Sequence, residues 1–169
     1  MFNKENQKLK IKMTKLKSQK LLTIIIVLIL IIFCWLLLFE KNNLMSEKKL
    51  NYQTTQIKIG NQIITAEIAD TKEKRELGLS GRQFLPAGTS MLFIFDQPNY
   101  HSFWMKNMNF PIDIIWLDAN KKIIDLSENL SPLSFPKTFS PKTPAQFVLE
   151  VPANFIRRNQ LQIGTDISF

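Results

Sequence analysis

The chain has 169 residues and a formal net charge of +8, most of which lies in residues 1–20, where seven Lys accompany one Glu. The remaining residues carry 15 basic and 13 acidic side chains, so they offer no basic face that would follow a phosphate backbone, and we expect no nucleic-acid partner. One His and one Cys argue against a zinc site and exclude an intramolecular disulfide, and no motif predicts another metal or a cofactor.

Residues 21–39 form an apolar run without charge, Pro or Gly, which predicts a transmembrane helix. At about 1.5 Å per residue the run spans about 28 Å, close to the thickness of the hydrocarbon core. A cleaved signal peptide would need a small-residue cleavage site, and the sequence after Phe39 has none. Cys34 follows the bulky Phe33, which argues against lipoprotein processing. We therefore expect an uncleaved signal anchor.

The Lys-rich segment before the anchor predicts the topology, because an excess of positive charge stays on the cytoplasmic side. We expect a cytoplasmic basic segment at 1–20, the transmembrane anchor at 21–39, a polar tether at 40–55 and an extracytoplasmic domain at 56–169. The predicted localisation is the cell membrane, crossed once, with residues 21–39 in contact with the cytoplasmic membrane.

The extracytoplasmic domain begins with a predicted β-hairpin. Alternating apolar residues at 57–59 and 62–69 flank the turn signal Gly60-Asn61. A short helix at 72–79 follows, with Asp70 or Thr71 as its N-cap. The apolar run at 91–95 predicts a buried strand, and Asp96-Gln97-Pro98-Asn99 predicts a turn.

The rest of the domain predicts more short elements. We expect a second short helix from Pro152 to about Gln160, and strands at 101–107, 112–118, 122–126, 146–151 and 166–169. This pattern predicts an α+β fold: a small, mainly antiparallel β-barrel or sandwich with two short helices, preceded by the transmembrane helix. Residues 131–145 hold four Pro and no Gly. Such a stretch is either a functional loop or a stiff crossover with its aromatic residues on the barrel, and we favour the crossover.

One part of the sequence resembles a known family. The run MLFIFDQPNYHSFWMKNMNFPIDIIWLDANKKIIDL at 91–126 is supported by Ala69-Asp70-Thr71 upstream and by Phe147-Val148-Leu149-Glu150 downstream. Together they resemble domain-of-unknown-function family 192, also called uncharacterised protein family 0127, over residues 63–169. The resemblance implies a small β-rich domain, often secreted or membrane-tethered in bacteria and archaea. It implies no established activity.

The central motif also contains the first candidate site. Ser102, Trp104 and Lys106 alternate along the predicted strand and therefore share a face. An aromatic ring beside an ammonium group can stack against a sugar or receive a carboxylate. The alternative is that Trp104 seals the core and the Lys106 stem lies over it.

Two polar residues near the following turn complete the candidate set. Asn107 stands where the strand meets the turn, and its amide can bond the backbone there. Asp113 alternates with apolar residues, so its carboxylate must be paired, with Lys106, Arg82 or the backbone of 108–111 as possible partners. The stronger interpretation of Asp113 is a buried group that holds the turn.

Three functional hypotheses follow from these residues. The first is a non-catalytic binding or envelope-assembly module for an acidic or sugar-like ligand, such as an envelope glycan, or for a protein segment. Its site comprises Arg82, Trp104, Lys106, Asn107 and Asp113. The second is an envelope hydrolase that uses His101 with Asp96 or Asp113, although a surface His beside a turn is the simpler interpretation. The third is a purely structural domain. Asp125, Glu128 and Glu150 show no spacing that indicates a catalytic carboxylate pair.

Overall fold

A computed structural model of the protein describes residues 27–36 and 50–169. The chain divides into two compact units, residues 1–49 and residues 50–169. Residues 27–36 are helical with exposed side chains. Within the described ranges, the structure contains no helix with the length and apolar character needed to cross a bilayer. The predicted basic segment at 1–20, most of the tether and both ends of the predicted anchor at 21–39 lie outside the described residues.

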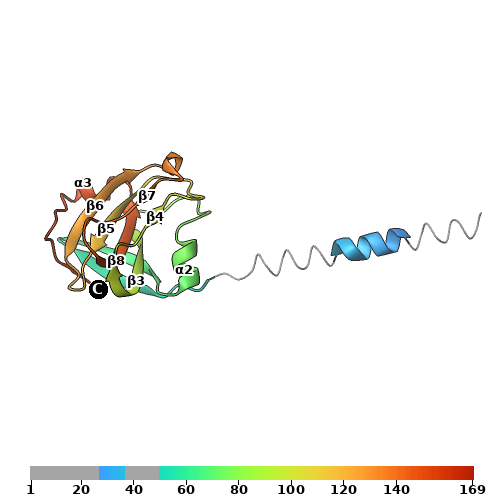
Figure 1. The fold of residues 1–169 in the computed structure, drawn as a ribbon, viewed down its shortest axis with the longest axis horizontal. Coiled ribbons are helices and arrows are strands. Elements are labelled where there is room, and N and C mark those ends of the chain that lie inside the picture. Colours follow the sequence, from blue (N-terminus) through green and yellow to red (C-terminus); the bar gives the residue numbers. More distant parts are fainter. Residues whose placement is uncertain (1–26, 37–49) are drawn as a thin grey trace, which may run out of the picture. The chain divides into compact units, whose positions relative to one another are not determined.

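The second unit is built on a seven-stranded sheet with the strand order β6-β5-β8-β3-β2-β1-β9 (Figure 1). Neighbouring strands are antiparallel except β2 and β3, which are parallel. The strands of this sheet are β1 (Thr54–Ile59), β2 (Gln62–Ala69), β3 (Thr89–Asn99), β5 (Ile112–Leu117), β6 (Ile123–Leu130), β8 (Ala145–Pro152) and β9 (Ile167–Ser168).

Short elements complete the fold of this unit. A separate two-stranded sheet pairs β4 (Phe103–Trp104) with β7 (Thr138–Phe139). The helical elements are α2 (Lys72–Leu77), α3 (Phe155–Arg158) and the 3-10 turn η1 (Pro132–Ser134). A mostly-β domain with few helices confirms the predicted α+β class.

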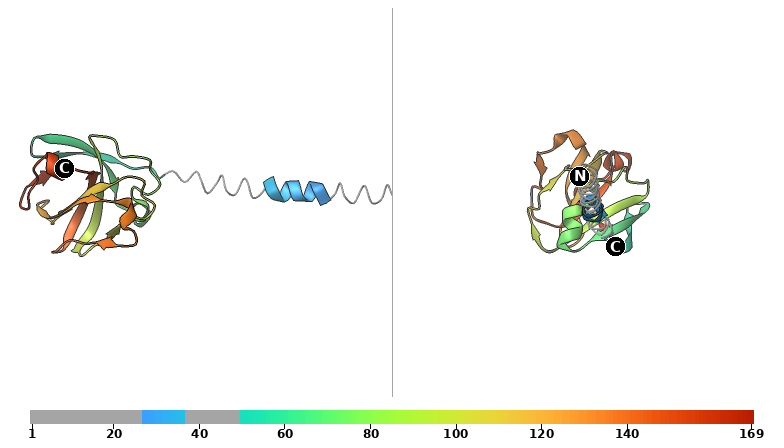
Figure 2. Two further views of the ribbon diagram at one scale, coloured as in Figure 1. Left: turned by 90° about the horizontal axis from the view of Figure 1, so that it is seen from above. Right: turned by 90° about the vertical axis from the view of Figure 1, so that its right-hand side faces the viewer.

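The end of the chain connects the two edges of the large sheet. β9 pairs with β1, while Asp166 just before it forms a bridge with Lys122, next to β6. The Ile123 amide also donates to the Thr165 carbonyl over 2.9 Å, and the Gly164 amide donates to the Ile123 carbonyl over 2.7 Å. The sheet is therefore curled into a half-barrel, as Figure 1 and the left view of Figure 2 show.

The core consists of two apolar clusters on opposite faces of the sheet. β5 is buried at every position: Ile115 belongs to one cluster, and its neighbours Ile114 and Trp116 belong to the other. This division arises because successive residues of a strand point to opposite faces. The second cluster extends beyond the sheet to Leu79 and Met105, so the segments after α2 and β4 cover that face.

Most of the expected elements exist, although several have other bounds. The helix expected from Pro152 to about Gln160 is only the four residues of α3, because Pro152 still belongs to β8, and the strand expected at 122–126 continues to the end of β6. The hairpin has the expected turn, and α2 begins after Thr71, whose Oγ1 accepts from the Lys74 amide over 3.3 Å. Residues 96–99 are not a turn but the end of β3, because Asn99 pairs with Ala145 of β8. The strand expected at 101–107 is only two residues long, since β7 offers it two partners.

The Pro-rich stretch at 131–145 is a crossover that carries η1 and β7. Phe139 packs against the second core cluster. Phe135 remains 44% exposed with its ring edge-on to Trp104, at 6.2 Å between centroids, and Leu133 is 94% exposed. One of its two aromatic residues therefore packs on the core, and the other rests on the surface tryptophan.

Candidate functional site

A cavity of about 640 Å³ lies among α2, the loop after it, β3 and the segment around β4. Its size falls within the range typical of small-molecule sites. Aromatic rings form much of its wall: Phe93, Phe95, Phe103 and Trp104. Phe103 stands edge-on to Phe93 at 4.8 Å between centroids and to Trp116 in the core at 5.4 Å, which fixes the wall to the sheet.

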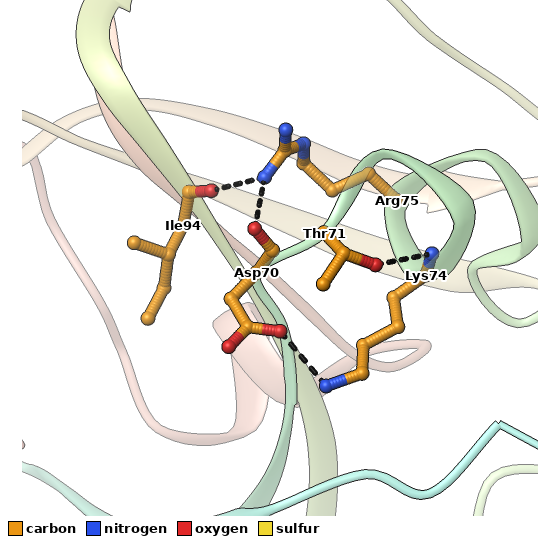
Figure 3. A network of polar contacts seen from close by, with 5 residues as sticks. All are labelled: Asp70, Thr71, Lys74, Arg75 and Ile94. Carbon is orange, nitrogen blue, oxygen red and sulfur yellow. Dashed lines mark hydrogen bonds and ion pairs between the residues drawn. The ribbon is translucent and has the colours of Figure 1, made fainter.

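Arg75 is held at the cavity by the start of α2 and by β3. Its Nη1 donates to the Asp70 carbonyl over 2.6 Å and to the Ile94 carbonyl over 2.9 Å, as Figure 3 shows. The Asp70 carboxylate pairs with Lys74 one turn along, at 2.8 Å. Both Arg75 bonds use one nitrogen of a group with five N–H donors, so most of its donors remain available.

An aromatic stack lies beneath this guanidinium. Arg75 lies over the Phe95 ring, 5.1 Å from its centroid, and His101 stacks on Phe95 with 3.4 Å between ring centroids. The stack brings α2, β3 and the segment before β4 together at one wall of the cavity.

Lys106 places a second cation at the cavity. Its Nζ lies 5.4 Å from the centroid of the Trp104 ring, and Trp104 is 52% exposed. The Lys106 carbonyl accepts from Ser80 Oγ over 3.0 Å, and the Asn107 carbonyl accepts from the Gly81 amide over 2.9 Å. These bonds hold the turn after β4 against the loop after α2.

The two cations have no carboxylate partner within the described part of the chain. Lys106 and Arg75 form no ion pair there, whereas Lys72, also at the cavity, lies 3.8 Å from Glu76. An anion that enters the cavity would therefore meet two cations that no ion pair within the described residues occupies.

Glu150 of β8 is a buried carboxyl at the same cavity. It is 6% exposed, it lines the cavity, and its Oε2 has no hydrogen-bond partner among the residues that the structure describes. Burial raises the pKa of Glu150 to about 8, against a smaller opposing effect of the Arg82 charge. Near neutral pH the group is therefore protonated, and it can donate a hydrogen bond as well as accept one. The sequence signal was a single acidic residue within the apolar run at 147–151, where an ordinary strand has no need of one.

His101 is partly buried beside this cavity. Its Nε2 has no hydrogen-bond partner in residues 27–36 and 50–169. Burial lowers the pKa of His101 below its usual value, against the smaller opposing effects of hydrogen bonds to the backbone of Gln97 and Ala145. Neither Asp96 nor Asp113 lies within hydrogen-bond or ion-pair distance of the ring. The geometry therefore supplies no orienting carboxylate for the predicted hydrolase pair.

The predicted binding set is divided by the structure. Trp104, Lys106 and Asn107 line the cavity, but Arg82 and Asp113 do not. Arg82 forms a two-pronged ion pair with Glu67, with 3.0 Å between Nη1 and Oε1.

Asp113 is fully buried. Within the described residues, its carboxylate accepts hydrogen bonds from backbone amides and from no side chain. Oδ1 accepts from Asn129 over 2.7 Å and from Asn154 over 3.1 Å, and Oδ2 accepts from Ile156 over 3.0 Å. The partners suggested by the sequence, Lys106, Arg82 and the 108–111 backbone, are wrong. The expected buried pin exists, but it joins β5 to the end of β6 and to the start of α3, which has no side-chain cap of its own.

The chain is similar to known proteins in sequence and in fold. Residues 55–169 match the model of the DUF192 family, described as Uncharacterized ACR. A UPF0127 protein of Pyrococcus furiosus is 31% identical over 108 residues, which cover 60% of this chain and 83% of that protein.

Two solved structures are similar in fold. A protein of Sinorhizobium meliloti 1021, described as a candidate transcription regulator, has a TM-score of 0.67 and 25% identity, over 71% of this chain and 96% of that one. A protein of unknown function from Novosphingobium aromaticivorans has a TM-score of 0.67 and 22% identity, over 73% of this chain and 90% of that one. The second likeness shows a shared fold alone.

Proposed function

The chain belongs to the DUF192 family, also called UPF0127, and from this premise we propose that its folded domain is a binding module for a small acidic ligand. The observation that carries the proposal is one cavity that combines aromatic walls with two cations, Arg75 and Lys106, that have no ion-pair partner in the described part of the chain. Guanidinium and ammonium groups bind carboxylates through charge-assisted hydrogen bonds, and aromatic walls bind the apolar body of a ligand. Among the ligands expected from the sequence, these groups favour a small acid over a sugar or a protein segment.

The proposed module works outside the cytoplasm, attached to the membrane. The support is in the sequence: residues 21–39 are long and apolar enough for a span, and the Lys excess of residues 1–20 favours a cytoplasmic N-terminus. The polar tether then lets the domain meet ligands at the membrane surface.

Binding is tested with para-isopropylphenylacetate, which has one carboxylate and an apolar body. The full chain in lipid nanodiscs should bind this probe, and Lys106→Met should weaken binding roughly 10-fold, because a charge-assisted hydrogen bond is lost. Methionine retains an apolar stem beside Trp104 and removes only the charge. Ligand-observed NMR titration measures both affinities.

The matched control is Lys58→Met, which removes an exposed lysine on β1 away from the cavity. It should leave the affinity unchanged. Equal loss in both variants would mean that the probe responds to net charge alone, and the absence of binding by the unmodified chain would overturn the proposal.

The topology is tested by fusing alkaline phosphatase after Phe169 in bacterial cells. The fusion should be active, since this enzyme needs disulfides that form outside the cytoplasm. Deleting residues 21–39 should abolish the activity while the fusion is still made. An inactive fusion on the complete chain would contradict the predicted orientation.

A further inference from the structure

The cavity contains a polar group that binding of a simple acid would leave unused. Glu150 is buried on β8, and its register neighbours on the adjoining strands are the apolar Met91 of β3 and Ile114 of β5. Its Oε2 has no hydrogen-bond partner among the described residues. Buried polar atoms normally have a partner, so an orphan at the wall of a cavity indicates a partner that comes from outside the protein.

Burial, and not the surrounding charge, favours the neutral form of Glu150. No described cation lies within ion-pair distance of its carboxyl group. Arg82 is the charged group that affects the pKa of Glu150, and its guanidinium is already paired with the Glu67 carboxylate. The other titratable groups that line the cavity are Lys72, Arg75, Glu76, His101 and Lys106. Burial outweighs the charge of Arg82 and raises the pKa of Glu150 to about 8.

The polar groups of the cavity also differ in depth. Lys106 is exposed and Arg75 is partly buried, whereas Glu150 is buried. The rings of Phe93 and Phe103 line the same cavity. A ligand that fills the cavity therefore meets two cations that solvent reaches, aromatic rings, and a buried carboxyl group that can donate a hydrogen bond.

We infer that Glu150 recognises a carbonyl oxygen at the inner end of the ligand, so that the cavity selects carboxylic acids with a second, uncharged acceptor across an apolar spacer. This inference rests on the proposed function and names the ligand class of the same site. The carboxyl proton of Glu150 donates to the ligand oxygen, and the ligand carboxylate meets Arg75 and Lys106. An ionised Glu150 loses the donor and repels the oxygen.

The test compares two probes of nearly the same shape, para-acetylphenylacetate and para-isopropylphenylacetate, on the full chain in lipid nanodiscs. They differ in one acceptor oxygen. At about pH 6.5 the acetyl compound should bind roughly 5-fold more tightly, which corresponds to one neutral hydrogen bond. At about pH 9.5 the donor form of a group with pKa near 8 falls to a few per cent, so the preference should disappear. The isopropyl compound reports any effect of pH on the cations.

Two variants separate the possible outcomes. Glu150→Gln keeps an N–H donor that does not titrate, so it should retain the preference at both pH values. Glu150→Met removes the donor and should abolish the preference at both. Equal binding of the two probes by the unmodified chain would overturn this inference and leave the proposed function standing, whereas binding of neither would overturn the proposed function. If a variant fails to fold by circular dichroism, the pH comparison on the unmodified chain still decides.

Discussion

Raising the pH from about 4.5 to above 8 should lower the free energy of unfolding by as much as about 5 kcal/mol through Glu150 alone. Burial raises the pKa of this carboxyl from 4.5 to about 8 in the folded protein, so the folded state holds the proton more tightly than the unfolded state. The resulting stabilisation is complete below the unfolded pKa and is lost as the pH rises through the folded pKa. Urea unfolding at a series of pH values measures it.

Glu150→Gln isolates this contribution, because its amide is neutral at every pH of the series. The difference in unfolding free energy between the two proteins cancels the titration of all other groups, including His101, whose lowered pKa acts in the opposite direction at acid pH. We expect the difference to change steadily in favour of the glutamine variant between about pH 5 and pH 8. Parallel curves for the two proteins would show that Glu150 has an ordinary pKa.

Asp113→Ala should lower the free energy of unfolding by about 3 to 5 kcal/mol, because three backbone amides then lose their acceptor. These amides belong to Asn129, Asn154 and Ile156, which come from two separate segments of the chain. Water does not replace the carboxylate readily, since Asp113 is fully buried. The loss should appear as a lower urea midpoint with little change in slope.

Asp96→Ala is the matched control for this prediction. Asp96 is an exposed carboxylate in the last part of β3 and forms no ion pair in the described part of the chain. Its replacement should change the unfolding free energy by no more than about 0.5 kcal/mol. Similar losses in the two variants would show that Asp113 does not pin β6 and α3 to β5.

The sequence predicted correctly those features of the domain that depend only on neighbouring residues. Gly60-Asn61 predicts a tight turn whatever surrounds it, and Thr71 predicts a helix start because an N-cap bond spans three residues. The extent of β3 was not predictable in this way. Pro98 indicates a turn, but pairing of Asn99 with Ala145, distant in the sequence, keeps the chain extended.

The candidate site was predictable only in part, for a related reason. Alternation along one strand places Trp104 and Lys106 on one face, and both line the cavity. Arg75 and Glu150 could not be assigned to it, because they reach it from α2 and β8. For Asp113 the sequence indicated that the carboxylate is buried and needs a hydrogen-bond partner. Which amides donate to it depends on the packing of α3 against β5, which the sequence did not predict.

The amino-acid sequence by itself determined the family, the β-rich class, the order of most elements and the separation of an apolar N-terminal segment from a charge-balanced domain. These properties depend on composition and on patterns within a few residues. Only the tertiary structure decided which side chains surround the cavity, that Arg75 and Lys106 lack carboxylate partners there, and that Glu150 keeps its proton near neutral pH. Desolvation and charge pairing depend on distances between segments, and those distances exist only once the sheet has curled and α2 and β4 lie against it.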